Sequence, residues 1–426
     1  MKKTILTCII AFMAFPLFAQ YTGPGYYRVL NLGSAKRYLS IANNQIEERY
    51  NSKDKIMSLL TTSAYGFEIP ASSLATVKKK DADPSTILYI SGSTTDGLVI
   101  KGQGIDTKTL TQGFDLLERD GYLYCKINEG GVATEAFLVE FNDNEKYDSN
   151  CSVVGRSKLK DFEGYTKWKI EKIDNETNFL GIAPNEGVKI GDKYYTTFYA
   201  DFAIELPTGM KAYYIDKYYT DTNHVQEPIA ELQEITSGKI PSGTPVIIEC
   251  NSDNAANNKI NIISESLDKI QSNKLDGRYF CYIEYINYHE KTNYELSNPD
   301  LKNALVFNQG TMRVLGVKDG QLAMVNDNTD ALVKTRKEGN TSKYYYYIPA
   351  NKAYLPIKSS ESSATSIKLL LPQKYDEAMS ITRITTDEIN KTGIYTLTGV
   401  KVKEGNDATN LPSGIYIIDG KKQVIR

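Results

Sequence analysis

Short segments in which apolar and polar residues alternate, or in which a few apolar residues stand together, recur along nearly the whole chain. Glycine, proline, asparagine or aspartate bounds most of them, as expected for strands separated by turns. The clearest predicted strands are residues 26–29, 38–41, 87–90, 97–100, 123–127, 152–154, 194–199, 211–214, 245–250, 279–285, 312–317, 344–348 and 367–371. The pattern predicts an all-β fold, and a chain of 426 residues is long enough for two or three domains.

The first predicted domain, residues 20–175, consists of three units of roughly fifty residues each, which indicates internal repetition. Each unit carries an aromatic residue in a similar position near its end, namely Phe67, Phe114 and Trp168. The arrangement resembles a ricin-type β-trefoil, a family in which such aromatic residues fill one shared core. Thr166 stands where that family has the glutamine of its Gln-x-Trp signature. A β-barrel or sandwich with evenly spaced strands is the alternative.

Residues 185–375 form a second, aromatic-rich region, which we predict to be β-sandwich-like. It contains a short repeated motif, because the sequence Ile-Pro-Ser-Gly at residues 240–243 recurs in similar form as Ile-Pro-Ala-Asn at residues 348–351. In both copies the proline fixes φ and the last residue accepts a positive φ, so each copy should form a turn before a strand. Residues 348–355 resemble segments of exported Bacteroidetes proteins of unassigned function.

Residues 380–426, which follow a predicted linker at residues 372–379, are expected to form a small separate β-module. They contain Tyr-x-Leu-x-Gly-x-x-Val from Tyr395, then Leu-x-x-Gly-Ile-Tyr from Leu411, then a basic and apolar tail. The dipeptide Asp-Gly at residues 419–420 is a strong hairpin signal. The combination resembles the C-terminal sorting domain of the Por (type nine) secretion system, although it is shorter. A β-module that caps the preceding domain is the alternative.

Residues 1–19 have the layout of a secretory signal peptide. Lys2 and Lys3 precede the apolar residues 5–15, and Ala19 provides the small residue at the expected cleavage point. The apolar stretch is too short to span a bilayer comfortably. We therefore expect a secreted, periplasmic or outer-surface protein without a membrane span, whose mature chain begins at Gln20.

Charge and composition narrow the range of partners. The formal net charge is −2, so the chain has no basic excess with which to bind nucleic acid through its phosphates. It has 31 tyrosines but a single tryptophan. A tyrosine ring can stack on a sugar while its hydroxyl forms hydrogen bonds. Glycans or other cell-surface polymers are therefore the partners that we expect.

Four cysteines remain once the predicted signal peptide is removed: Cys125, Cys151, Cys250 and Cys281. Export would allow their oxidation, and the spacing favours the local pairs Cys125–Cys151 and Cys250–Cys281. Four buried free thiols are the alternative. The sequence contains no CxxC or Cys/His spacing typical of a zinc site.

No catalytic constellation is visible, and we predict no catalytic residue, metal or cofactor. The two histidines, His224 and His289, lie in polar segments that lack the turn of a nucleophile. A glycoside hydrolase stays open as an alternative, because its chemistry needs only two suitably placed carboxyl groups.

The candidate ligand contacts are Tyr218, Tyr219 and Asp221, which place two aromatic rings next to a carboxylate in a predicted polar loop. Rings and acceptors in this combination suit a glycan. The alternative is that the tyrosines belong to an ordinary strand with one buried and one exposed face. The sequence thus predicts an exported, non-enzymatic binding or adhesion protein with glycans as ligands. A structural scaffold without a small ligand and a carboxylate-based glycoside hydrolase are the other interpretations.

Overall fold

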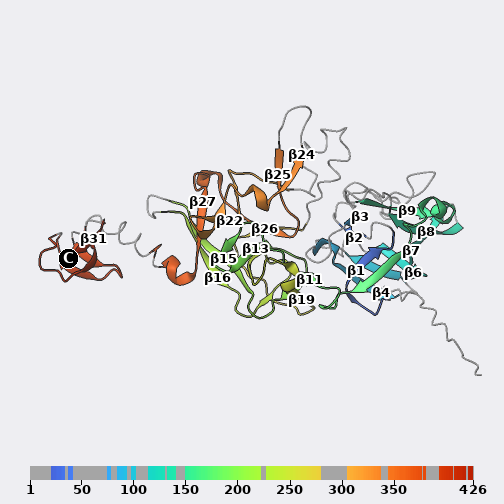
Figure 1. Cartoon of the computed structure of the whole chain (residues 1–426), viewed down its shortest axis with the longest axis horizontal. Coiled ribbons are helices and arrows are strands. Elements are labelled where there is room, and N and C mark those ends of the chain that lie inside the picture. The colour runs from blue at the N-terminus through green and yellow to red at the C-terminus, as the bar shows by residue number, and fades with distance from the viewer. Residues whose placement is uncertain are drawn as a thin grey trace, which may run out of the picture.

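The computed structural model describes residues 21–33, 37–41, 74–77, 84–93, 97–101, 114–129, 132–140, 149–221, 227–279, 305–336, 344–376, 378–379, 393–405, 407–418 and 421–425. The regular elements in these residues are β-strands, short 3₁₀ segments and a helical segment that begins at residue 372. The predicted all-β class is therefore confirmed. Figure 1 shows the strands in three groups that follow one another along the chain.

The first group is an antiparallel sheet of ten strands. They are β1 (Gly25–Asn31), β2 (Tyr38–Ile41), β3 (Leu74–Val77), β4 (Leu88–Ser93), β5 (Gly97–Lys101), β6 (Phe114–Arg119), β7 (Tyr122–Glu129), β8 (Val132–Glu140), β9 (Ser149–Gly155) and β10 (Trp168–Lys172). Their order is β10-β1-β2-β3-β9-β8-β7-β6-β5-β4. Because β1 also pairs with β4, at the far end of this order, the sheet turns back on itself (Figure 1).

The turn between β6 and β7 follows directly from its sequence. Asp120 has a φ of 53° and Gly121 a φ of 79°. Positive φ at both central positions is the type I′ geometry, whose twist matches that of the flanking strands. Asp319 and Gly320 repeat this geometry in the central region, with φ values of 51° and 73°.

The single tryptophan lies inside the first sheet. Trp168 is 2% exposed, and its indole N–H donates a hydrogen bond of 2.9 Å to the carbonyl of Leu138. Phe67 and the side chain of Phe114 lie outside the described part of the chain. The shared aromatic core of a trefoil therefore stays a prediction.

A buried ion pair connects two strands of the first sheet. Arg37 immediately precedes β2, and its Nη1 atom lies 2.6 Å from Oε1 of Glu140, the last residue of β8. Neither side chain has exposed surface. Burial removes the hydration of both charges, and their attraction offsets part of that cost.

The central region consists of a second ten-stranded sheet with smaller sheets beside it. The large sheet contains β12 (Lys189–Ile190), β13 (Lys193–Phe198), β15 (Lys211–Tyr219), β16 (Ile229–Glu234), β18 (Val246–Cys250), β20 (Asp276–Arg278), β22 (Met312–Lys318), β23 (Gln321–Val325), β26 (Lys352–Pro356) and β27 (Ser366–Leu370). A four-stranded sheet contains β11 (Leu180–Gly181), β14 (Ala203–Glu205), β17 (Lys239–Ile240) and β19 (Lys259–Ile263). A three-stranded sheet contains β21 (Leu305–Val306), β24 (Val333–Arg336) and β25 (Tyr344–Ile348).

The large and the four-stranded sheet share one apolar core. The four-stranded sheet contributes Leu180, Ile204, Ile240 and Ile260, and the large sheet contributes Phe198, Ala212, Val246 and Ile248. Alternate side chains of a strand point to the same face, so each sheet presents one apolar face to the other. The two sheets thus pack face to face here, and the sandwich-like domain over residues 185–375 stays a prediction.

The two related Ile-Pro segments form the turns that their sequences predict. Gly243 has a φ of 68° and Asn351 a φ of 58°. Both conformations lie in the left-handed region, which glycine and asparagine tolerate best. The strands β18 and β26 follow these turns, as expected.

Cys250, the last residue of β18, is a free and fully buried thiol. Its proposed partner, Cys281, lies outside the described residues, and so do the side chains of Cys125 and Cys151. At Cys250 the structure thus shows the buried free thiol that was the alternative to a disulfide.

A buried arginine joins the first sheet to the beginning of the central region. Arg28 of β1 donates hydrogen bonds to Thr86 Oγ1 at 2.9 Å, to Asn178 Oδ1 at 2.8 Å and to the carbonyl of Phe179 at 2.7 Å. Ile87, beside Thr86, packs in the core of the central sandwich. The two groups of strands are therefore packed against each other at this junction.

The last group is a four-stranded sheet with its own small core. Its strands, in the order β29-β28-β30-β31, are β28 (Gly393–Thr396), β29 (Lys401–Glu404), β30 (Gly414–Ile418) and β31 (Lys421–Ile425). Ile394, Tyr416 and Ile418 form its core. The predicted linker before it is helical at residues 372–376, and Tyr375 there packs against Ile229.

Within the described ranges, no helix is long and apolar enough to cross a membrane.

Candidate functional site

The structure separates the two tyrosines that the sequence placed together. Tyr218 and Tyr219 are the last residues of β15, so the prediction that they lie in a loop is wrong. A bulge at Asp216 shifts the register, which passes from Ile215 opposite Leu232 to Lys217 opposite Glu231. Since neighbouring strand residues point to opposite faces, Tyr218 and Tyr219 cannot form one contact surface.

Each of the two tyrosines packs in its own environment. Tyr218 packs against the core of the large sheet, and its hydroxyl lies 3.2 Å from Glu361 Oε2. Tyr219 packs beside Ile229 and Tyr375, and burial, together with the nearby Asp221 carboxylate, raises its pKa. Asp221 therefore acts on Tyr219. His224 and His289 lie outside the described residues.

A different group of tyrosines gathers where the first sheet meets the central region. Tyr26 of β1 pairs across the strands with Tyr89 of β4. The two rings meet edge to face with their centroids 5.3 Å apart. The ring of Tyr26 makes the same kind of contact, at 5.5 Å, with Phe202 of the central region. Tyr89 keeps 37% of its surface exposed and is the outermost of these rings.

A second aromatic pair joins Tyr199, on the segment that carries Phe202, to Tyr279, which follows β20. Tyr199 stacks on Tyr279 with ring centroids 4.3 Å apart and an interplanar angle of 20°. The ring of Tyr199 lies directly on Gly277, where an added Cβ would come within 2.2 Å of the ring. Only glycine can occupy this position of β20, so the glycine fixes the place of the stacked pair.

Asp201 lies in the sequence between Tyr199 and Phe202, and its carboxylate acts electrostatically on both aromatic groups. Burial, followed by the charge of Asp201, raises the pKa of Tyr26 to about 12. Burial also raises the pKa values of Tyr199 and Tyr279, and Asp201 adds to both shifts. We call Asp201 with Tyr26, Tyr89, Tyr199 and Tyr279 the Asp201 cluster.

The Asp201 cluster combines two properties that a glycan site needs. Asp201 and the rings of Tyr26, Tyr199 and Tyr279 are only partly buried, and Tyr89 is exposed. Tyrosine rings can stack on the apolar faces of sugars, and a carboxylate accepts hydrogen bonds from sugar hydroxyls. Because the pKa of Tyr26 is raised, its hydroxyl keeps its proton at neutral pH and can act as a donor.

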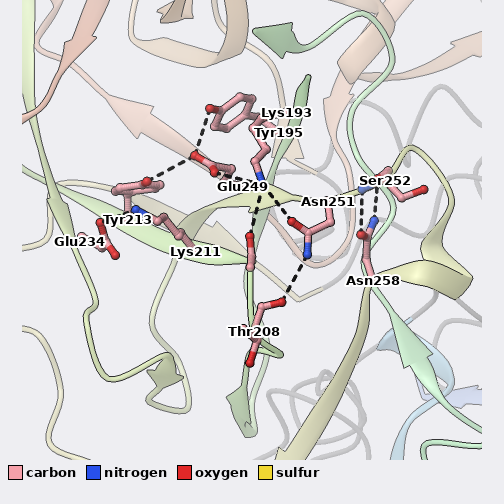
Figure 2. A network of polar contacts seen from close by, with 11 residues as sticks. Lys193, Tyr195, Thr208, Lys211, Tyr213, Glu234, Glu249, Asn251, Ser252 and Asn258 are labelled. Atoms are coloured by element: carbon pink, nitrogen blue, oxygen red, sulfur yellow. Dashed lines mark hydrogen bonds and ion pairs between the residues drawn. The ribbon is translucent and has the colours of Figure 1, made fainter. Parts of the chain in front are cut away.

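A polar network on β13, β18 and β15 also brings tyrosines and a carboxylate together, and Figure 2 shows it. Glu249 Oε2 accepts hydrogen bonds from the hydroxyls of Tyr195 at 3.1 Å and of Tyr213 at 3.3 Å. Lys193 Nζ lies 3.8 Å from Glu249 Oε1 and 2.9 Å from Asn251 Oδ1. The register explains the convergence, because Tyr195 stands directly opposite Glu249 on the neighbouring strand.

This network serves the sheet rather than a ligand. Tyr213 is 7% exposed and belongs to the core of the large sheet, against which Tyr195 also packs. Burial and the Glu249 charge raise the pKa of Tyr195 to about 12. The hydroxyls are already engaged with Glu249, and the rings face the core, so neither is available for stacking on a sugar. The Asp201 cluster is therefore the better candidate for ligand binding.

The side-chain amine of Lys352 is a further polar group inside the central region. The ammonium of Lys352 donates hydrogen bonds to Asn185 Oδ1 at 3.1 Å and to the Thr196 hydroxyl. These are neutral oxygens, so burial lowers the pKa of Lys352 to about 8. Burial has the opposite effect on the nearby thiol of Cys250 and raises its pKa to about 12. The described residues contain no group of three or more His, Cys, Asp or Glu side chains that could hold a metal ion.

Comparison with known proteins finds no matching family model, no matching curated protein and no matching solved structure.

Proposed function

We propose that the protein is an exported, non-enzymatic binding protein that attaches to glycans through the Asp201 cluster. The observation that supports this proposal is that the Asp201 carboxylate acts on members of two tyrosine pairs, Tyr26 with Tyr89 and Tyr199 with Tyr279. Tyr26 comes from β1 and Tyr89 from β4. Tyr199 follows β13, and Tyr279 follows β20. Strand pairing, packing and the glycine at position 277 hold them in place before any ligand arrives. Such preorganisation lowers the entropy cost of binding.

The test of this function is binding to a glycan array, followed by calorimetric titration of the best oligosaccharide. Tyr89→Ala should weaken binding about tenfold or more, because it removes the most exposed stacking surface. Tyr89→Phe keeps the ring and should bind nearly as well as the wild type. Tyr214→Ala provides the matched control, because it removes a partly buried strand tyrosine outside the cluster.

Equal loss of affinity in the Tyr89 and Tyr214 alanine variants would show that the cluster is not the binding site. An array without any bound glycan would favour the scaffold interpretation. Release of new reducing ends from a bound polysaccharide would instead support the glycoside hydrolase.

Export forms the second part of the proposed function. The layout of residues 1–19 supports cleavage after Ala19, and the resemblance of the C-terminal module to a sorting domain supports delivery to the cell surface. N-terminal sequencing of the protein from culture supernatant or envelope fractions should therefore begin at Gln20. A mature chain that retains Met1 would contradict the proposed location.

A further inference from the structure

Three aromatic rings pack together on one face of the first sheet, where β6, β7, β8 and β9 lie side by side (Figure 1). Tyr124 of β7 stands directly opposite Phe137 of β8, and their rings stack with centroids 5.5 Å apart. Tyr122, two residues before Tyr124 and therefore on the same face, meets the ring of Phe137 edge to face at 5.6 Å. Tyr124 and Phe137 are only 7% and 2% exposed, so other side chains cover their rings.

Two arginines lie over the stacked pair and share a single carboxylate. Cζ of Arg119, the last residue of β6, lies 4.6 Å from the ring centroid of Tyr124. Cζ of Arg156, which follows β9, lies 5.7 Å from the ring centroid of Phe137. Arg119 donates hydrogen bonds of 3.1 and 2.9 Å to the two oxygens of Glu135, and Arg156 donates one of 2.8 Å to the same carboxylate. Both guanidinium groups are therefore held in place before any ligand arrives.

The backbone brings a third cation to the same face. The N–H of Trp168 donates a hydrogen bond of 2.7 Å to the carbonyl of Gly121, so the start of β10 meets the turn between β6 and β7. The preceding residue, Lys167, donates from Nζ to the carbonyl of Asp120 at 2.5 Å, and the same Nζ lies 3.3 Å from the ring centroid of Tyr122. We call these three cations the cationic face: Arg119, Arg156 and Lys167.

The cationic face carries more positive charge than its carboxylates match. Within the described ranges, Glu135 is the one carboxylate within 4.0 Å of the arginines, and Lys167 has none at that distance. Asp120 acts on Arg119 from farther away, which leaves three cations against two carboxylates. The side chain of Arg119 is 43% exposed and that of Arg156 is 69% exposed. A guanidinium has five N–H donors, and the contacts with Glu135 use two from Arg119 and one from Arg156, so donors remain for a ligand.

We propose that the cationic face binds the carboxylate or sulfate groups of an acidic polysaccharide, at a site separate from the Asp201 cluster. Guanidinium groups bind such oxyanions through short, charge-assisted hydrogen bonds. Three cations over neighbouring rings suit a ligand that repeats its charge along a chain better than a single small anion. Nucleic acid fits less well, because the whole protein carries a net charge of −2. A membrane fits less well too, because the stacked rings beneath the cations expose almost no apolar surface.

The experiment measures by calorimetry how the full mature protein binds three polymers of equal length: dextran sulfate, polygalacturonate and neutral dextran. At about pH 7, where uronates are ionised, we expect both acidic polymers to bind at least about tenfold tighter than dextran. Their affinity should fall as salt rises, because the attraction is between charges near the surface. A DNA duplex of similar length and inorganic sulfate alone should both bind more weakly than the acidic polymers.

Variants assign the binding to the cationic face. Arg156→Gln and Lys167→Gln should each weaken binding of the acidic polymers about fivefold, since each removes one charge-assisted contact. The fluorescence of Trp168 checks that these variants stay folded. Lys189→Gln provides the matched control, because Lys189 Nζ also lies over a tyrosine ring, 4.7 Å from the centroid of Tyr194, but belongs to the central region. This control should keep the affinity of the wild type.

Equal losses in the Lys167 and Lys189 variants would show that the overall charge, and not the cationic face, attracts the polymers, and would overturn the inference. Equal affinity for the acidic polymers and for dextran would also overturn it. The same holds if the duplex or inorganic sulfate binds as tightly as the acidic polymers. None of these results bears on the binding of neutral glycans by the Asp201 cluster, which the tyrosine variants test separately.

Discussion

Replacement of Arg37 by methionine is expected to lower the free energy of unfolding of the first sheet by about 3–5 kcal/mol, because it removes the positive charge that lies against the buried Glu140 carboxylate. The pair lies at 2.6 Å with no exposed surface on either side chain. Urea unfolding followed by tryptophan fluorescence measures this loss in the correct part of the molecule. Trp168 is the only tryptophan, and it hydrogen-bonds to Leu138 in the same strand as Glu140.

Two further variants show whether the charge is the cause. The double variant Arg37→Met with Glu140→Met removes both charges and should recover much of the lost stability. Arg156→Met removes an arginine that is 69% exposed and 2.8 Å from Glu135, and it should cost at most about 1 kcal/mol. If Arg37→Met and the double variant lost the same stability, packing rather than charge would hold the two strands together.

The second large effect is a dependence of stability on pH that arises from Lys352. Its pKa is about 8 in the folded protein, against 10.5 for an ordinary lysine. Between these values the unfolded chain binds more protons than the folded one, so the free energy of unfolding should rise with pH. From pH 7.5 to 9.5 the increase due to Lys352 should be about 2 kcal/mol.

The measurement compares the wild type with Lys352→Met at each pH, since other groups also titrate in this range. Cys250 acts in the opposite direction, because its folded pKa of about 12 exceeds the ordinary value of 9.0. Stability from this thiol is thus present below pH 9 and is lost as the pH rises above it. The difference between the two proteins should grow in favour of the wild type as pH increases. A difference that stays constant with pH would mean that the Lys352 amine has an ordinary pKa.

The strands could be predicted from the sequence because their signals are local. The alternation of apolar and polar residues predicted a strand at residues 38–41, where β2 lies (Tyr38–Ile41). The two Ile-Pro segments form the predicted turns at Gly243 and Asn351. The order of the strands could not be predicted, because β1 pairs with β10 and β4 through contacts that no short window of sequence contains. The bulge at Asp216 carries no such local signal either, and it decides which face Tyr218 occupies.

The candidate site was missed for the same physical reason. Tyr218, Tyr219 and Asp221 are close in sequence, but strand geometry turns the two rings away from each other. Tyr26 and Tyr89 are far apart in sequence and meet through the pairing of β1 with β4, and Tyr199 and Tyr279, also far apart, meet only in the folded central region. The abundance of tyrosine was the sole sequence signal for them, and it indicates a chemistry without indicating a place.

The pairing of β1 with β10 has a consequence for how the chain acquires its structure. Leu30 pairs with Tyr38 on one edge of β1 and with Lys169 on the other, so the second edge stays open until β10 has been made. Contacts between such distant segments carry a large loop-closure cost and slow the folding of β-proteins. A nascent chain that ends before Trp168 would expose an unpaired strand edge, which is a site for wrong association. The first sheet is therefore expected to complete its folding only after translation has passed Lys172, because β1 cannot pair along its second edge before β10 has been made.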